Sequence, residues 1–262
     1  MHQITGVLFR AGANVVSNHE FVDPASKRFF MRTACSGPID GPAVEQAVSA
    51  IVPPGSWVQM KRAAPRRILV LVSREHHCVA DLLVRHHFGE LGADLLGVVS
   101  NHDNLRPLAE KFSVPFHHVS HEGLSREAHE EALESIIRPL NPDLIVLAKY
   151  MRVLSPGMVS RWTHRIINIH HSFLPAFVGA RPYHQAYHRG VKVIGATAHF
   201  VSDKLDEGPI IMQQVIPMDH SYSPEDLAKA GRDIERTVLA HSLKLLVEDR
   251  VFLCENRTII FD

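Results

Sequence analysis

Short apolar runs alternate with longer helical segments between residues 66 and 170, and this alternation constrains the fold more tightly than any other feature. The apolar runs have the length of buried strands, and we predict strands at residues 68–72, 95–99, 115–118, 144–147 and 166–169. The segments between them predict helices at residues 78–91, 105–112, 127–140 and 156–162. Strands and helices that alternate in this way form a parallel sheet with helices on both faces. We therefore expect an α/β domain with a Rossmann-like parallel sheet.

The predicted sheet has one edge suited to binding, because ligands of such sheets lie beyond the carboxyl ends of the strands. Three of the predicted strands reach that edge just before Ser73, Ala148 and His170. The pattern continues with two further strands, a helix that begins after Ser223 and a hairpin. We predict these elements at residues 194–201, 210–218, 224–246 and 251–261.

Residues 1–63 predict a separate, small α+β unit. Its pattern indicates helices at residues 6–12 and 42–51 and strands at residues 14–21, 28–33 and 57–61. The stretch 63–67 is the expected linker. The chain should therefore divide into a first domain of residues 1–63 and a larger domain of residues 64–262.

The composition argues against two classes of partner. The chain has 28 lysines and arginines and 28 aspartates and glutamates, so no net field attracts nucleic acid or an anionic membrane. No apolar run approaches the roughly 20 residues of a membrane helix, and the N-terminus shows no signal-peptide pattern. The three cysteines are far apart, as is typical of reduced thiols. We expect a cytoplasmic protein with neither a nucleic-acid nor a membrane partner.

The 19 histidines raise the question of a metal site. His184 and His188 have the i, i+4 spacing that places two side chains on one helix face. No acidic residue or cysteine lies beside them at ligand spacing, and the H-E-x-x-H motif is absent. We therefore expect no metal site.

Three residues around the last strands have side chains suited to acyl chemistry. Asn168 and His170 alternate along one predicted strand and should face the same side of the sheet. Asp206 lies in an acidic glycine turn after a later strand. An amide and an imidazolium stabilise an oxyanion, while a carboxylate orients the imidazole and accepts a proton from water. Near apolar strands we expect the pKa of Asp206 to be raised towards neutrality.

Several motifs in this region resemble those of the folate-dependent formyltransferase fold family. They are Asn168-Ile169-His170, Ser172-Phe173-Leu174-Pro175, His199-Phe200-Val201 and Asp206-Glu207-Gly208-Pro209. Within the family, HHSFLPAFVGARPYHQAY at residues 170–187 and LDEGPIIMQ at residues 205–213 are similar to the deformylase branch. The resemblance extends from about Arg66 to the end of the chain.

The resemblance implies a hydrolase that converts 10-formyltetrahydrofolate into formate and tetrahydrofolate, and so balances one-carbon pools for purine biosynthesis. By this resemblance Asn168 and protonated His170 hold the formyl oxygen, and Asp206 orients His170 and takes a proton from the attacking water. The folate is the substrate, so no further cofactor is expected.

The resemblance also assigns the residues that bind the folate. The loop after the strand at residues 144–147 is similar to the loop that lines the pterin pocket of the family, and the backbone of residues 203–206 is expected at the pterin edge. The substrate-binding residues implied in this way are Met151, Arg152, Val153, Leu154, His171, Val201, Asp203, Lys204 and Leu205.

The end of the first strand in the larger domain argues against a phosphorylated acceptor. A phosphate cradle needs glycines so that backbone amides approach the anion closely, whereas Ser73-Arg74-Glu75-His76-His77 contains none. His171 stands where the transferases of the family carry proline, by resemblance. Both features favour water as the nucleophile.

Residues 1–63 are similar to an ACT regulatory domain that lacks its first strand. We expect this unit to support a homo-oligomer, either a dimer or a tetramer. Two other functions stay open from the sequence. The chain could transfer the formyl group to an amine acceptor, or it could be a non-catalytic regulator that senses folate and amino acids.

Overall fold

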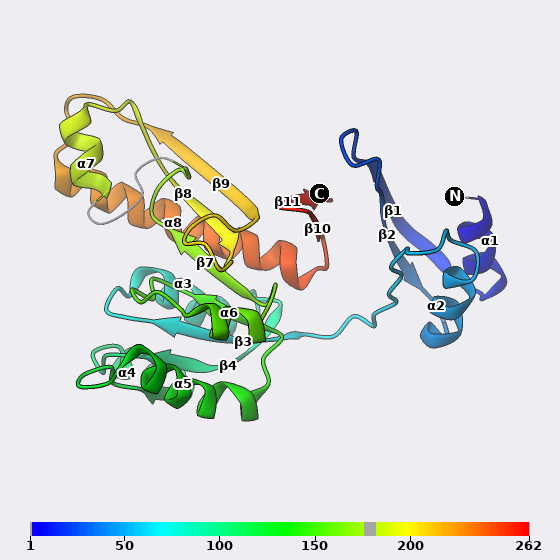
Figure 1. The fold of residues 1–262 in the computed structure, drawn as a ribbon, viewed down its shortest axis with the longest axis horizontal. Helices are drawn as coiled ribbons and strands as arrows, with labels where there is room; N and C mark the ends of the chain where they lie inside the picture. The colour runs from blue at the N-terminus through cyan, green and yellow to red at the C-terminus, as the bar shows by residue number, and fades with distance from the viewer. Residues whose placement is uncertain (1, 176–181, 262) are drawn as a thin grey trace. The chain divides into compact units, whose positions relative to one another are not determined.

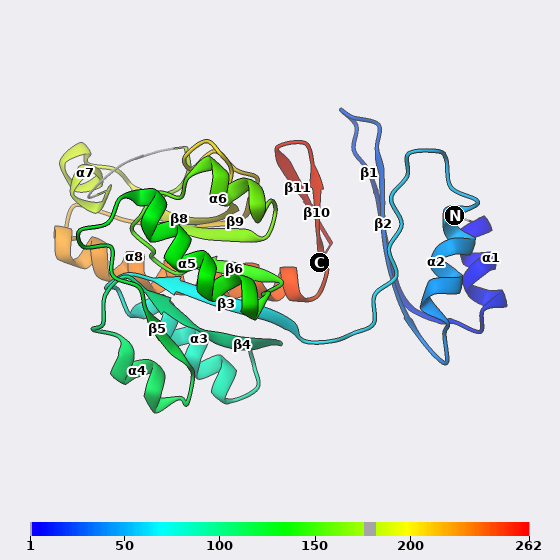
Figure 2. The same ribbon diagram turned by 60° about the horizontal axis from the view of Figure 1, so that its bottom comes forward.

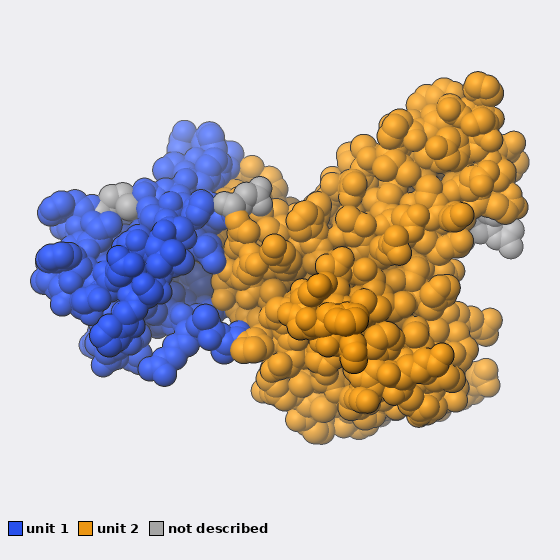
Figure 3. Space-filling view, turned by 180° about the vertical axis from the view of Figure 1, so that it is seen from behind, with its two compact units in different colours: residues 1–64, 261–262 blue, residues 65–260 orange. Residues whose placement is uncertain are grey.

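The structure, a computed structural model, describes residues 2–175 and 182–261. Residues 176–181 of the motif at 170–187 lie outside the described residues, as does the side chain of His184. The chain forms two compact units, one of residues 1–64 and 261–262 and the other of residues 65–260 (Figure 3).

The first unit consists of two helices and a two-stranded antiparallel ribbon. Its elements in chain order are α1 (His2–Arg10), β1 (Asn14–Val22), β2 (Phe29–Ser36) and α2 (Gly41–Ser49) (Figure 1). The helices contribute four buried residues, Val7 and Leu8 from α1 and Val44 and Val48 from α2. A small apolar core of this kind is the main source of stability for so short a unit.

The strand predicted at residues 57–61 is not formed, so this expectation is wrong. β1 and β2 pair with each other, and no further strand pairs with either of them among the described residues. The segment instead contacts α2, because the backbone amide of Met60 donates to Glu45 Oε2 at 2.7 Å. The residue pattern alone did not reveal that the segment lacks a pairing partner.

The second unit is built around a seven-stranded sheet in the order β5-β4-β3-β6-β7-β8-β9. Its first five strands are parallel, and all five overlap the predicted strands. They are β3 (Arg66–Val72), β4 (Ala93–Ser100), β5 (Phe116–His118), β6 (Leu144–Leu147) and β7 (Ile166–His170). The expected α/β class is therefore confirmed for this unit.

The last two strands correct the expectation of a wholly parallel sheet. β8 (Val193–Phe200) is antiparallel to β7, and β9 (Ile210–Pro217) is antiparallel to β8. Residues 201–209 form a short connection between β8 and β9, and a short connection joins antiparallel strands, since a parallel pair requires a long crossover. The sheet is mostly parallel, with an antiparallel edge.

Helices cover both faces of this sheet (Figures 1 and 2). α3 (His77–His87), α4 (Arg106–Lys111) and α8 (Pro224–Val247) pack against one face, and α5 (Arg126–Leu140) and α6 (Pro156–Arg161) pack against the other. We call these the α3/α8 face and the α5/α6 face. The remaining elements are α7 (Pro182–Arg189) and the hairpin of β10 (Val251–Cys254) and β11 (Arg257–Ile260).

Two helix ends show how local sequence determines the boundaries. α8 begins at a capping box in which Ser223 and Asp226 bond each other's backbone, as predicted for the cap at Ser223. α3 ends at His87, four residues before its predicted end, and Gly89 follows with a φ of 72°. Glycine takes this left-handed conformation readily and so ends helices.

The strand order places a topological switch point between β3 and β6. The chain passes from β3 outward to β4 and β5, and then returns to the other side of β3 as β6. Ligands of open α/β sheets bind at such a switch point, beyond the carboxyl ends of the strands. Residues 73–76 and 148–154 form the loops that follow β3 and β6.

Candidate active site

β7 and β8 bring the polar residues of the site opposite each other. In the antiparallel register Asn168 pairs with His199, and His170 pairs with Thr197. Ile167 belongs to the core on the α3/α8 face. Because side chains alternate along a strand, Asn168 and His170 project to the α5/α6 face.

The turn between β8 and β9 adds Asp206 to this group. Asp206 Oδ1 lies 3.3 Å from His170 Nδ1 and 3.7 Å from His199 Nε2. Asp206 has a φ of 58°, a left-handed conformation that costs an L-residue other than glycine about 1–2 kcal/mol. A Cβ atom at Gly208 would lie 1.8 Å from the carbonyl oxygen of Phe200. The turn thus approaches the strand so closely that only glycine fits at residue 208.

The contacts of His199 show how Asn168 is oriented. His199 Nδ1 donates to the carbonyl oxygen of Phe200 at 2.9 Å. Burial lowers the pKa of His199, so its ring is neutral and Nε2 carries a lone pair. Asn168 Nδ2 lies 3.3 Å from Nε2 and donates to it. One amide hydrogen of Asn168 is therefore engaged with His199, and the amide group carries a second.

His170 is buried, with one ring nitrogen directed to Asp206 and the other without a partner. Nε2 has no hydrogen-bond partner among the described residues. Buried polar atoms without partners are rare, and in an enzyme they point to a substrate or a reacting group. Asn168, whose second amide hydrogen is not used in the bond to His199, lies on the same face of β7. The two side chains together could hold an oxyanion.

The pKa of Asp206 is lowered rather than raised, so the expected direction is wrong. Burial alone would raise this pKa, but the hydrogen bond with His170 and the positive charge of that ring outweigh burial, and His199 adds to the effect. The sequence showed the apolar strands around the turn and did not show how close the imidazole lies. Asp206 is therefore a carboxylate at neutral pH.

The loop after β6 presents apolar side chains at the same edge. Met151 and Val153 are 62% and 55% exposed. The loop is fixed at its start, because the Met151 amide donates to Ser73 Oγ at 3.0 Å. Leu154 and Val201 pack against the core on the α5/α6 face and so anchor this region to the sheet. Met151 and Val153 thus form an exposed apolar surface, which we call the apolar shelf.

The other predicted folate-binding residues differ in how far they are exposed. Asp203, Lys204 and Leu205 are exposed in the turn after β8, and Arg152 is half-buried beside the shelf. His171 differs from them, because its ring stacks on that of His170 with centroids 5.0 Å apart and planes tilted by 20°. Burial and the nearby charges of Lys149 and His170 lower the pKa of His171 to about 4.

Sequence reasoning missed a buried polar network next to His171, which we call the Glu235 cluster. Its members are His77, Lys149, Tyr183 and Glu235. Glu235 Oε2 lies 2.8 Å from His77 Nε2 and 3.2 Å from Lys149 Nζ, and Tyr183 donates to Oε1 at 2.6 Å. These residues are spread over 158 positions, so no local motif could have joined them. The only signal was a glutamate on the apolar side of a helix.

Sequence reasoning also left His199 outside the site, although the motif that contains it was recognised. Its signal was the alternation of polar Thr197 and His199 with alanines on one strand. Which residue of the neighbouring strand they face follows only from the register of β7 and β8.

One group in the described part of the chain has the residue types of a metal site. Ligand atoms of His77, Cys78 and Glu235 lie within 4.8 Å of one another. The same carboxylate oxygen of Glu235 contacts both His77 and the ammonium of Lys149. The positive charge that a metal ion would supply is already provided by these two side chains.

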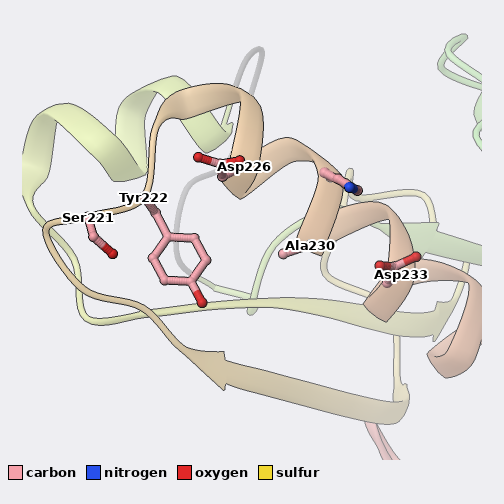
Figure 4. Close-up of a pocket in the computed structure, with 6 residues that line it drawn as sticks. Ser221, Tyr222, Asp226, Ala230 and Asp233 are labelled. Atoms are coloured by element: carbon pink, nitrogen blue, oxygen red, sulfur yellow. The ribbon is translucent and has the colours of Figure 1, made fainter.

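A separate hollow of about 300 Å³ lies beside the start of α8 (Figure 4). Its lining residues come from the turn before α8 and from the first turns of the helix, and none is a predicted site residue. They are Ser221, Tyr222, Asp226, Lys229, Ala230 and Asp233.

None of the described helices combines the length and hydrophobicity that a membrane crossing requires.

Residues 66–243 match the profile of the family described as "Formyl transferase". Over 258 residues, the chain is 52% identical to formyltetrahydrofolate deformylase of Escherichia coli O6:H1, covering 98% of this chain and 92% of the relative.

Solved structures show the same similarity in three dimensions. A formyltetrahydrofolate deformylase from Pseudomonas syringae superposes with a TM-score of 0.93 at 39% identity, covering 100% of this chain and 89% of that one. A glycinamide ribonucleotide transformylase from Symbiobacterium toebii superposes with a TM-score of 0.73 at 31% identity, covering 80% of this chain and 100% of that one. The more similar of these two structures is the hydrolase, and its match includes the first unit.

Proposed function

The chain belongs to the formyl transferase family, and from this premise we propose that it hydrolyses 10-formyltetrahydrofolate to formate and tetrahydrofolate. Relatives that match it over nearly the whole chain are formyltetrahydrofolate deformylases. The structural observation that carries the proposal is the buried His170, held by Asp206 at Nδ1 and unpartnered at Nε2.

Asn168 and His170 stabilise the oxygen of the formyl group in this mechanism. Water attacks the formyl carbon, and negative charge develops on the oxygen as the tetrahedral intermediate forms. The second amide hydrogen of Asn168 and protonated His170 Nε2 donate to this oxygen. Preorganised donors of this kind are effective because they need no reorganisation when the charge appears.

Asp206 moves the proton. Its carboxylate, ionised at neutral pH, orients His170 and accepts a proton from the attacking water. The same proton then passes to N10 of the folate as the carbon–nitrogen bond breaks. The products are formate and tetrahydrofolate, and no redox change occurs, so the reaction as proposed needs no further cofactor.

The apolar shelf binds the pterin ring. A flat ring gains most from burial of its faces, and its polar edge needs backbone hydrogen bonds. Met151, Val153 and Leu205 supply exposed apolar surface for this purpose. We assign Arg152, Leu154, His171 and Val201 to the walls of this site, and the backbone of Asp203 and Lys204 to its polar edge.

Three broader assignments belong to the same proposal. The reaction supplies formate and balances folate pools for purine biosynthesis, and it takes place in the cytoplasm, where reduced cysteine thiols are stable. The first unit is an ACT-like domain. It supports a dimer or tetramer through the β1–β2 ribbon, because a two-stranded ribbon is marginally stable alone.

The test is to incubate the protein with 10-formyltetrahydrofolate in ¹⁸O-labelled water without any amine. We expect equal amounts of formate and tetrahydrofolate, with one labelled oxygen in each formate. His170→Ala should lose about 100- to 1000-fold in rate, while His188→Ala, which removes an exposed histidine, serves as the matched control. Tight folate binding without release of formate would exclude the hydrolase.

A further inference from the structure

The Glu235 cluster has a balanced charge. Burial would lower the pKa of His77, but interactions with Cys78, Glu235 and Glu75 outweigh burial and raise this pKa to about 11. His77 and Lys149 are thus both cations, and the buried carboxylate of Glu235 contacts both. Glu75 lies 3.4 Å from the other ring nitrogen of His77 and adds a second carboxylate. A phosphorylated acceptor would find no uncompensated cation in the cluster.

α8 is shaped to hold the ring of Tyr183 in this cluster. A Cβ atom at Gly231 would lie 2.1 Å from both Cζ and the hydroxyl oxygen of Tyr183. Gly231 and Glu235 are four residues apart, so they occupy the same face of the helix. The ring therefore rests on the helix backbone at Gly231, and its hydroxyl donates to Glu235 one turn later.

Tyr183 connects the cluster to the reaction centre through His171. The ring of His171 lies 6.3 Å from that of Tyr183, with planes tilted by 47°. The same ring stacks on His170 at 5.0 Å. A continuous row of side chains thus extends from α8, on the α3/α8 face, through Tyr183 and His171 to His170, which projects to the α5/α6 face.

We propose that the Glu235 cluster restricts the nucleophile to water by closing the α3/α8 side of the reaction centre to any larger amine. This inference rests on the proposed function. The folate occupies the α5/α6 side, with His171 in its wall, so an acceptor molecule would have to approach from the opposite side, which Tyr183 fills. Water is small enough to reach the formyl carbon there, whereas an amine carries a substituent that needs the volume of the Tyr183 ring. Blocking an unwanted partner in this way is a common source of specificity.

The experiment measures how the formyl group is divided between water and an amine. ¹³C-formyl-labelled 10-formyltetrahydrofolate is supplied with excess glycinamide, and labelled formate and N-formylglycinamide are quantified together. The variants are Tyr183→Ala, which removes the ring, and Glu235→Gln, which keeps the shape of the side chain and removes its charge. Tyr187→Ala removes an exposed tyrosine from the same helix and is the matched control.

We expect the wild-type protein and Tyr187→Ala to release formate with only a trace of formylated amine. Tyr183→Ala should raise the share of formylated amine by about 10- to 100-fold, the range over which pocket shape discriminates between substrates. Glu235→Gln should raise the same share by a smaller factor, since the ring remains but loses its charged acceptor. It also serves as the second variant if Tyr183→Ala fails to fold.

Two outcomes would overturn the inference in different ways. If the wild-type protein releases formate and the variants hydrolyse the substrate without forming any formylated amine, the cluster does not select the nucleophile. The proposed function would then stand alone. If the wild-type protein releases no formate in the absence of amine, the proposed function fails, and the inference that rests on it fails with it.

Discussion

Replacing Asp206 by asparagine tests the central ion pair of the site. The substitution removes the negative charge and preserves the shape of the side chain. The fold should hold, because asparagine tolerates the left-handed φ of 58° that residue 206 adopts. His170 would lose the carboxylate that lies 3.3 Å from its Nδ1. The variant therefore isolates the electrostatic contribution of Asp206.

The size of the effect follows from the position of the carboxylate. Asp206 Oδ1 lies 3.3 Å from His170 Nδ1, where it stabilises the positive imidazole that faces the developing oxyanion. Removing one electrostatic stabiliser of this kind costs about 100- to 1000-fold in rate, or about 2.7–4 kcal/mol. Loss of the proton acceptor adds to this factor, since general bases contribute about 100- to 10,000-fold.

The assay is single-turnover release of formate, with folate binding measured separately on the same preparation. We expect Asp206→Asn to bind tetrahydrofolate with nearly the wild-type affinity and to lose at least about 1000-fold in the chemical step. Glu207→Gln makes the same chemical change at the neighbouring, exposed residue and should keep its activity. A rate within tenfold of the wild-type value would refute the role of the Asp206–His170 pair.

Three further results follow from other contacts. Asn168→Ala should lower kcat by about 100- to 1000-fold with little change in folate affinity, as measured by steady-state kinetics. Glu235→Gln should lower the free energy of unfolding by about 3–5 kcal/mol, as measured by urea titration. The lowered pKa of Glu235 stabilises the fold above pH 4.5, and the raised pKa of His77 stabilises it fully below pH 6.5. The difference in the free energy of unfolding between the wild-type protein and Glu235→Gln should therefore be largest between pH 4.5 and pH 6.5. This difference should shrink as the pH falls towards about 2 or rises through about 11. Gly208→Ala forces a Cβ atom against the Phe200 carbonyl and should destabilise the protein by about 1–3 kcal/mol or more, as measured by thermal unfolding.

The parallel part of the sheet could be predicted because its signal is local. Buried strands need runs of apolar residues, and the helices between them need longer amphipathic segments, so both are visible in a short window. The last two strands of the sheet show the limit of such a signal. Their apolar pattern was recognised, but their direction depends on the connections between strands. The prediction of a strand at residues 57–61 was wrong for a related reason, since a strand forms only where a neighbouring strand can pair with it.

The candidate site was likewise predictable only in part. The sequence by itself determined the residue types of the acyl chemistry, since Asn168 and His170 alternate on one strand and Asp206 lies in a recognisable glycine turn. Only the tertiary structure decided how these residues interact, because pKa values and hydrogen bonds depend on distances across the fold. The proximity of His170 reversed the expected pKa direction of Asp206. The Glu235 cluster could be found only once α8 lay against the carboxyl edge of the sheet, since its members are too far apart in the chain to form a motif.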